Sequence, residues 1–345
     1  MLVRKSVSLR GIFYFSGHHI PWLTAWAVSV ACLYQYTSLR EFAIPWLPAS
    51  IIATAVAFYV GFKNNQAYDR VWEARKIWGA IVNGSRSWSN MTDNFISNLY
   101  KESPASSNEI KQRKQQLIYR HIAWLYVLRN QLLVATQWEH ASLKGLYGVW
   151  GRKNIEKFGL GNYKNEDIDA LLAKYLSKEE LEQKSQYANY ATKLIHLQGK
   201  ELAALREQDF LSDRKHIELQ RMLNDFYEQQ GKAERIKKFP LPRLYANLSF
   251  VFVCIFIIML PFCLMGEFSK LGDIGIWISV PLVVIVGWVY VSMELVGDYS
   301  ENPFEGSYND VPMLSICRTI EIDLLQMLGE TDLPKPIQPV GNVLM

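Results

Sequence analysis

Cysteine is scarce in this sequence, and motifs that are typical of enzymes are missing from it. The 345 residues include 4 cysteines, whose spacing suggests neither a disulfide nor a metal site: Cys32, Cys254, Cys263 and Cys317. No HExxH, GxSxG or phosphate-loop sequence is present. We therefore expect a protein that is not an enzyme and that holds no metal or other cofactor.

Charged residues are missing from four stretches of the chain: 11–39, 42–62, 244–266 and 274–293. A bilayer core of about 30 Å needs roughly 20 helical residues, so each stretch is long enough to cross it. A cleaved signal peptide is the weaker alternative for the first stretch, which is too long for one and is followed at once by a second span. The sequence predicts an all-α membrane protein with four transmembrane helices.

Lysine and arginine indicate the orientation of these helices. They gather before the first stretch, after the second and before the third: Arg4, Lys5, Arg10, Lys63, Arg70, Arg75, Lys76, Lys232, Arg235, Lys237, Lys238 and Arg243. The two short outer loops hold only Arg40 and Lys270. By the positive-inside rule, both termini and the central region are cytoplasmic. This topology also accounts for the net charge of +4, so we expect no nucleic-acid partner.

The charge pattern divides the chain into four segments. Residues 1–62 hold the N-terminal segment and the first two transmembrane helices, and residues 63–243 form a helical cytosolic domain. Residues 244–296 hold the other two transmembrane helices, and residues 297–345 form a cytosolic segment with a tail.

Proline and apolar spacing predict the elements within these segments. No proline stands between Pro48 and Pro104, which favours one long helix over 48–83 that reaches about 50 Å and extends beyond the bilayer. Further helices are predicted at 110–144, 167–181 and 207–232, with loops at 103–108 and 145–165. We expect no strand, and an extended, loosely held tail at 333–339.

One face of the second apolar stretch repeats every four residues, at Thr54, Phe58 and Phe62, and small residues flank it. Beyond Phe62 the pattern turns polar. This pattern fits an ordinary packed face followed by a cytosolic extension. It also fits a pore helix, in which several copies form an apolar constriction that gates by dewetting. One four-span subunit is too small to enclose a pore, so the second interpretation requires a closed ring of subunits.

Three stretches of this sequence resemble motifs of the bestrophin family, in its bacterial branch. They are residues 61–79 after the second span, residues 234–242 before the third, and residues 301–304 with 309–312 after the fourth. The residues that carry the resemblance are Asn64, Asn65, Arg70, Trp72, Glu73, Arg75, Glu234, Arg235, Pro242, Asn302, Pro303, Phe304 and Asp310. The three motifs stand in the family's order among the four apolar runs.

The resemblance implies a homopentameric ion channel in the bacterial inner membrane, with the lipid bilayer, small inorganic ions and its own copies as partners. By motif alignment the pore neck falls on Thr54, Phe58 and Phe62, where animal members have a larger residue at the first position. Gln66, Asp69 and Glu73 would line a polar vestibule. A second, cytosolic aperture falls at Ile217, for which a core position in a cytosolic helix is the alternative.

Animal bestrophins bind calcium through acidic residues that follow the Asn-Pro-Phe motif. Here the corresponding residues 305–310 hold few carboxylates, so the sequence gives little support to calcium gating. The alternative for Asn302, Pro303 and Phe304, which we favour, is a cap and turn that pins the tail against the neighbouring subunit.

Ion selectivity stays open between two interpretations. Ring edges of Phe58 and Phe62 would favour anions such as chloride, whereas Asp69 and Glu73 would attract cations such as sodium or potassium. We favour an anion channel because the narrowest point should matter most. From another functional class, a membrane-anchored scaffold without a pore fits the same composition. A coupled transporter is less favoured, because the pairs of spans show no repeat.

Overall fold

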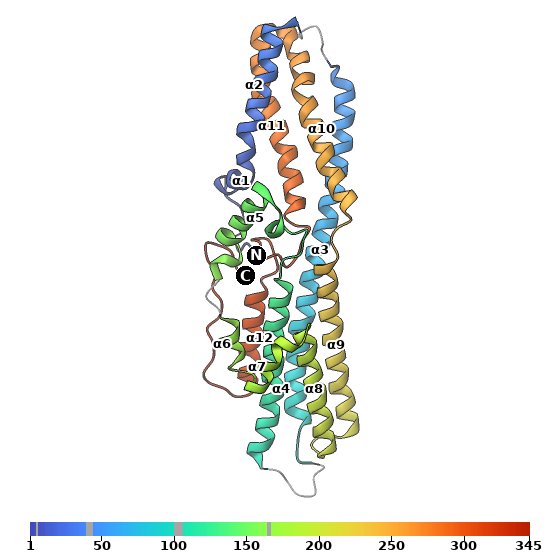
Figure 1. Ribbon diagram of the computed structural model, residues 1–345, viewed down its shortest axis with the longest axis vertical. Helices are drawn as coiled ribbons and strands as arrows, with labels where there is room; N and C mark the ends of the chain where they lie inside the picture. The colour runs from blue at the N-terminus through green and yellow to red at the C-terminus, as the bar shows by residue number, and fades with distance from the viewer. Residues whose placement is uncertain (5, 39–43, 100–105, 164–166) are drawn as a thin grey trace. The chain divides into compact units, whose positions relative to one another are not determined.

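The structure, a computed structural model, describes residues 1–4, 6–38, 44–99, 106–163 and 167–345, without the side chains of residues 146 and 147. Within these ranges the chain is helical (Figure 1), with isolated bridges of Val343 to Leu2 and Val340 in place of strands. The expected all-α fold is confirmed. The chain divides into two compact units: unit 1 (Met1–Val3, Trp72–Phe239, Pro303–Met345) and unit 2 (Arg4–Val71, Pro240–Asn302).

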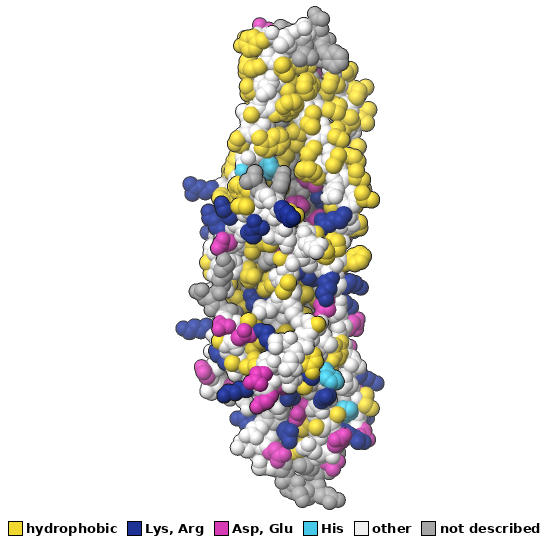
Figure 2. Space-filling model, viewed as in Figure 1, with side chains coloured by type: hydrophobic (Ala, Val, Ile, Leu, Met, Phe, Trp, Pro, Cys, Tyr) yellow, Lys and Arg dark blue, Asp and Glu magenta, His cyan; other side chains and the backbone are white. Residues whose placement is uncertain are grey.

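Unit 2 contains the most apolar helices, and hydrophobic side chains cover much of its surface in the view of Figure 2. Its elements are α1 (Leu9–Ser16), η1 (Gly17–His19), α2 (Ile20–Tyr36), the first part of α3 (Trp46–Phe95), α10 (Arg243–Phe268), η6 (Ser269–Leu271) and α11 (Asp273–Asp298). In Figure 1, α2 and α3 lie on opposite sides of this unit, with α10 and α11 between them. The unit is therefore a bundle in which each outer helix has one face turned away from the core.

Three helices in the described ranges are long and apolar enough to cross a membrane: α3, α10 with η6, and α11. The stretch 11–39 was predicted as one span, but the structure divides it into α1, η1 and α2. Pro21 stands in the first turn of α2, where a backbone N–H would have no hydrogen-bond partner within the helix, so its absence costs little. With 17 residues, α2 reaches about 25 Å at about 1.5 Å per residue. Its role as a fourth span stays a prediction.

Small residues and tyrosine hydroxyls hold unit 2 together. Leu23 packs on Gly287, where an added Cβ would lie 3.1 Å from Cδ2 of the leucine, so the glycine lets α2 approach α11 closely. The Tyr290 hydroxyl donates to the carbonyl of Ala53 at 3.0 Å and ties α11 to α3. This hydrogen bond offsets the free energy that an unpaired hydroxyl would cost in so apolar a unit.

Unit 1 holds the remaining helices. They are the second part of α3, α4 (Ser107–Leu132), η3 (His140–Ser142), α5 (Gly145–Phe158), η4 (Leu160–Tyr163), α6 (Ile168–Leu172), α7 (Lys178–Glu182), η5 (Gln183–Gln186), α8 (Tyr190–Glu207), α9 (Asp213–Lys238) and α12 (Met313–Met327). α4 packs against α8, α9 and α12, and nearly every residue from Leu117 to Arg129 on it is buried. α4 is therefore the central helix of this unit.

Hydrogen bonds join several polar side chains within this core. The Trp124 indole N–H donates to Gln230 at 3.0 Å, and the Tyr126 hydroxyl donates to Glu321 at 2.5 Å. Burial and the Glu321 carboxylate raise the pKa of Tyr126 above its ordinary value. The hydroxyl therefore stays protonated and keeps donating to Glu321.

Most predicted helices exist, but several boundaries were wrong, and the helix predicted at 167–181 is two short helices, α6 and α7. The long helix α3 begins at Trp46 and ends at Phe95, beyond the predicted 48–83. The helix predicted at 110–144 ends at Leu132, and the predicted loop 145–165 contains α5. Glycines in α5 indicated a loop, yet they serve packing, because a Cβ at Gly148 would lie 1.8 Å from the carbonyl oxygen of Leu143. The residues of the predicted loop 103–108 lie partly outside the described ranges.

The tail at 333–339 is extended, as predicted, but it is held to unit 1. Leu333 and Ile337 pack against the buried core, and Arg318 donates to the carbonyl of Lys335 at 3.0 Å. The prediction of a loosely held tail was therefore wrong, because the apolar residues between its prolines find a surface to cover.

Candidate functional site

Helix α3 has two different faces along its length in unit 2. Val56, Val60, Lys63 and Ala67 are buried, whereas Phe58 is 66% exposed and Phe62 is 61% exposed. At about 100° per residue, the buried positions fall in one narrow arc and the exposed positions lie opposite. Two large aromatic side chains thus stand outside the packed core of their own chain.

Thr54 shares this exposed face, one turn before Phe58. Its hydroxyl donates to the carbonyl of Ser50 within the same helix, at 2.9 Å. The hydroxyl hydrogen of Thr54 is therefore engaged within the helix, and the side chain exposes a methyl group and an oxygen that can accept a hydrogen bond. The three residues predicted as a neck lie on one face at intervals of about 6 Å.

The polar residues predicted for a vestibule continue the same face of α3. Gln66 and Asp69 are exposed and Glu73 is half-buried. The Glu73 carboxylate pairs with Lys76 at 2.6 Å, so much of its charge is compensated one turn further along the helix. Of the two acidic residues on this face, Asp69 is thus the one whose negative charge is less compensated.

Ile217, the predicted aperture residue, lies near the start of α9 and is 50% exposed. The alternative, a core position within this chain, is wrong. Leu219 and Leu223, on the opposite face, are the core residues of this part of α9. Ile217 therefore has an apolar side chain free to meet another copy or a passing ion.

A buried ion pair that the sequence did not predict joins α3 to α11. Lys63 Nζ lies 2.5 Å from Glu294 Oε1, and the lysine is 2% exposed. The Ser249 hydroxyl of α10 donates to the other oxygen of Glu294 at 2.5 Å. Next to Lys63, the amide of Asn64 donates to the carbonyl of Met293 at 2.9 Å. The segment of α3 directly after Phe62 is thereby fixed to α11, and α10 contacts the same glutamate.

A second cluster in unit 2 joins residues of two family motifs to Arg243, which directly follows the motif stretch 234–242. The Arg70 Nε–H donates to the carbonyl of Glu301 at 2.8 Å, and Arg243 pairs with the Glu301 carboxylate at 3.2 Å. Arg70 is half-buried, whereas Glu301 is buried. Pro242 stands at the N-cap of α10, directly before Arg243. Arg70, Arg243 and Glu301 thus form one charged cluster.

Asp310 organises the turn after the Asn-Pro-Phe motif in unit 1. Its carboxylate accepts three backbone N–H groups, from Phe304 (2.9 Å), Gly306 (2.8 Å) and Val311 (2.7 Å). Phe304 is fully buried with a positive φ of 68°, a conformation that non-glycine residues adopt only when held. This arrangement fits a turn at the motif, and the contact of the tail with a neighbouring subunit stays a prediction.

The remaining carboxylates near this turn contact basic side chains. Glu305 contacts His140 Nδ1 at 3.0 Å, and Glu139 contacts Lys237 Nζ at 2.5 Å. Lys237 also donates to the carbonyl of Phe304 at 3.1 Å. Burial raises the pKa of Glu139, and Lys237 opposes that shift. Because these carboxylates already have protein partners, few of their oxygens are free to coordinate a calcium ion of the kind that animal bestrophins bind after this motif.

The other motif residues differ in their surroundings. Glu234 accepts from Asn189 and Gln230, both at 2.8 Å, and so supports the packing of α8 on α9. Pro303 is buried and Asn302 is half-buried, while Asn65, Trp72, Arg75 and Arg235 are exposed. Each of the three motif stretches contains a point where the chain passes from one unit to the other, after Val71, after Phe239 and after Asn302.

Comparison with solved structures supports the fold. A bacterial bestrophin homologue from Klebsiella pneumoniae superposes with a TM-score of 0.72 at 22% identity, over 91% of this chain and 98% of that one. A second solved structure, of a variant of a membrane protein, superposes with a TM-score of 0.73 at 21% identity, over 92% of this chain and 99% of that one. At such identities the likeness concerns the fold alone.

Sequence comparison identifies relatives of nearly equal length. The voltage-dependent anion channel-forming protein YneE of Escherichia coli K12 is 28% identical over 98% of both chains. The voltage-dependent anion channel-forming protein mll4386 of Mesorhizobium japonicum is 25% identical over 82% of this chain and 75% of its own. Residues 18–326 match the family described as Bacterial/Fungal Bestrophin protein. The chain belongs to this bestrophin family.

Proposed function

We propose that this protein is a passive anion channel, in which several copies surround a pore lined by the exposed face of α3. The observation that carries the proposal is the exposure of Phe58 and Phe62, which a ring of copies would bring together around one axis. The relatives named as voltage-dependent anion channel-forming proteins support this function. Bestrophin-family members are ion channels and not enzymes, in agreement with the lack of enzyme motifs.

The neck would act through its apolar surface. Thr54, Phe58 and Phe62 form three layers on α3, and a ring of such layers excludes water until the pore widens. Aromatic ring edges carry the positive end of the quadrupole and can face a partly dehydrated anion. Chloride, a small and abundant anion, is the proposed physiological ion. A pentamer follows from the family resemblance.

The membrane topology is part of the proposal. α3, α10 and α11 would span the bacterial inner membrane, with α2 as a fourth and shorter span, and both termini would be cytoplasmic. Unit 1 would then extend into the cytosol. There, Gln66, Asp69 and Glu73 would line a vestibule, and Ile217 would form a second constriction. The lysine and arginine distribution supports this orientation.

A cation channel of the same architecture is the second candidate. The observation in its favour is Asp69, which is exposed on the face that bears Phe58 and Phe62. Against it, Glu73 is paired with Lys76, which offsets part of the negative charge on this face of α3. A scaffold without a pore would leave the exposed phenylalanines facing lipid only.

Reconstitution into liposomes tests conduction directly. Vesicles that contain the protein and are loaded with chloride should release it, when valinomycin carries potassium as counter-ion, at a rate proportional to the amount of protein. Protein-free vesicles set the background rate. Release equal to that background, from vesicles in which the protein is correctly folded, would contradict the anion channel and would fit the cation channel or the scaffold.

A further inference from the structure

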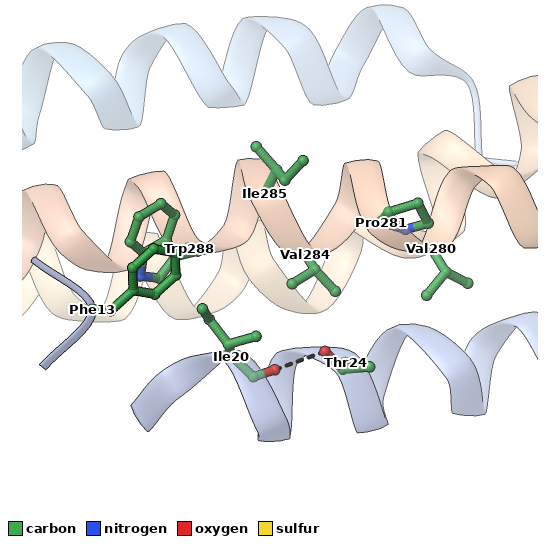
Figure 3. Close-up of a pocket in the computed structure, with 8 residues that line it drawn as sticks. All are labelled: Phe13, Ile20, Thr24, Val280, Pro281, Val284, Ile285 and Trp288. Atoms are coloured by element: carbon green, nitrogen blue, oxygen red, sulfur yellow. Dashed lines mark hydrogen bonds between the residues drawn. The ribbon is translucent and has the colours of Figure 1, made fainter. Parts of the chain in front are cut away.

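A groove of about 400 Å³ opens on unit 2, between the first elements of the chain and α11 (Figure 3). Phe13 and Ile20 form one wall, and Val280, Val284 and Trp288 form the other. The volume lies within the range of small-molecule pockets, about 300–1,000 Å³. The groove is therefore large enough to hold a ligand or a part of one.

The polar atoms that line the groove are satisfied by the protein itself. The Trp288 indole N–H donates to the Ser16 hydroxyl at 3.0 Å, and Ser16 is fully buried. The Thr24 hydroxyl donates to the carbonyl of Ile20 at 2.9 Å, along the dashed line in Figure 3. The groove thus presents carbon atoms to its occupant, which needs no hydrogen-bonding group at this depth.

Packing holds the walls of the groove in place. The rings of Phe13 and Trp288 stack with centroids 5.4 Å apart and an interplanar angle of 9°. Leu23 packs closely on Gly287, one residue before Trp288, which fixes α2 against α11. A site with such supported walls is formed before its ligand arrives, so little ordering entropy opposes binding.

We propose that the groove binds one acyl chain of an anionic phospholipid. α11 is apolar and long enough to cross a membrane, so lipid is the solvent that this face would meet. Arg10 is exposed and precedes Phe13 by three residues, on the same face of α1. A lipid whose chain fills the groove would place its phosphate near this guanidinium.

This site lies apart from the proposed pore face. The groove is built on α1, α2 and α11, and α2 and α3 lie on opposite sides of unit 2 (Figure 1). The inference rests on the membrane-spanning assignment of unit 2 but not on conduction. A bound lipid can therefore be measured in the absence of any current.

Native mass spectrometry of the full-length protein in a mild detergent tests the site. Phosphatidylglycerol should remain bound, whereas Val284→Trp, which fills the groove, should lower the retained lipid at least about fivefold. Val289→Trp is the matched control, because Val289 is exposed on the same helix but does not line the groove. Arg10→Ala leaves the groove intact and should lower the preference for phosphatidylglycerol over phosphatidylcholine at least about threefold.

The outcomes separate the proposal from its alternatives. Equal loss of lipid in Val284→Trp and Val289→Trp would indicate unspecific surface lipid and overturn the groove assignment. Should Val284→Trp fail to fold, Arg10→Ala still decides, since an unchanged lipid preference contradicts the proposed headgroup contact. Retention of oleate without phosphatidylglycerol would identify a fatty-acid site and overturn the commitment to a phospholipid.

Discussion

Lys63 and Glu294 are 231 residues apart in the chain, yet they form an ion pair of 2.5 Å whose two side chains are almost completely buried. The lysine directly follows Phe62, and the glutamate lies near the end of α11. Ser249 completes the site from α10. Three helices thus meet at one charged contact next to the proposed neck.

Breaking this pair from one side should destabilise the protein. Lys63→Met leaves the Glu294 carboxylate buried without its counter-charge, at a cost of about 3–5 kcal/mol. The double variant Lys63→Met/Glu294→Gln should recover most of the lost stability, since no uncompensated charge remains. Thermal unfolding followed by intrinsic fluorescence measures both. The exposed pair Lys270–Glu267 is the matched control. Here Lys270→Met should lower the free energy of unfolding by less than about 1 kcal/mol.

Removing the Asp310 carboxylate should loosen the turn that holds Phe304. Asp310→Ala leaves three buried backbone N–H groups without their acceptor, which we expect to cost about 3 kcal/mol of unfolding free energy. Asn309→Ala changes an exposed neighbour and serves as the control. Chemical denaturation gives both values. Equal stability of the two variants would contradict the capping role of Asp310.

His121 should make the stability of unit 1 sensitive to acid. It is fully buried beside Ser85, and burial lowers its pKa from 6.5 to about 3. Because the folded pKa is depressed, the unfolded chain binds the proton first as pH falls. Stability is therefore complete above about pH 6.5 and declines towards pH 3, by up to about 5 kcal/mol.

A substitution isolates the contribution of His121 from that of other groups. His121→Phe places an uncharged ring among Trp88, Trp124 and Phe226, which already surround it, and should flatten the decline of stability between pH 6.5 and about pH 4. His196→Phe, on the exposed side of α8, controls for the loss of one histidine. A decline with the same slope in both variants would exclude His121 as its source.

The neck assignment predicts an effect on current. Phe58→Ala or Phe62→Ala widens the apolar constriction and should raise single-channel conductance at least about twofold, without dissociating the oligomer. Phe250→Ala, also at an exposed phenylalanine but on α10, is the control. Unchanged currents in both neck variants would remove α3 from the pore.

The sequence predicted the elements better than it predicted their contacts. Charge-free stretches revealed the apolar helices, and the absence of proline indicated one long helix at α3, because both signals are local. The end of α3 at Phe95 was not predicted, since no local signal marks it. The break at Gly17–His19 was missed, since neither glycine nor histidine interrupts an apolar run by hydropathy. Helix α5 was missed because its glycines also fit a loop.

Contacts between distant residues could not be predicted in the same way. Lys63 and Glu294 each flank an apolar stretch, and that shared position is the one signal in the sequence that could have suggested a pair. Nothing local indicated that Asp310 would accept three backbone N–H groups, since this depends on the turn that Phe304 and Gly306 make. The exposed face of Thr54, Phe58 and Phe62 was visible as a four-residue repeat, and its role as a neck stays a prediction.

The reversal potential of the purified protein in a planar bilayer under a KCl gradient tests the central claim most directly. An anion channel predicts a reversal near the chloride equilibrium potential, with a shift when a large anion replaces chloride. A reversal near the potassium equilibrium potential would contradict anion selectivity and assign the dominant role to Asp69.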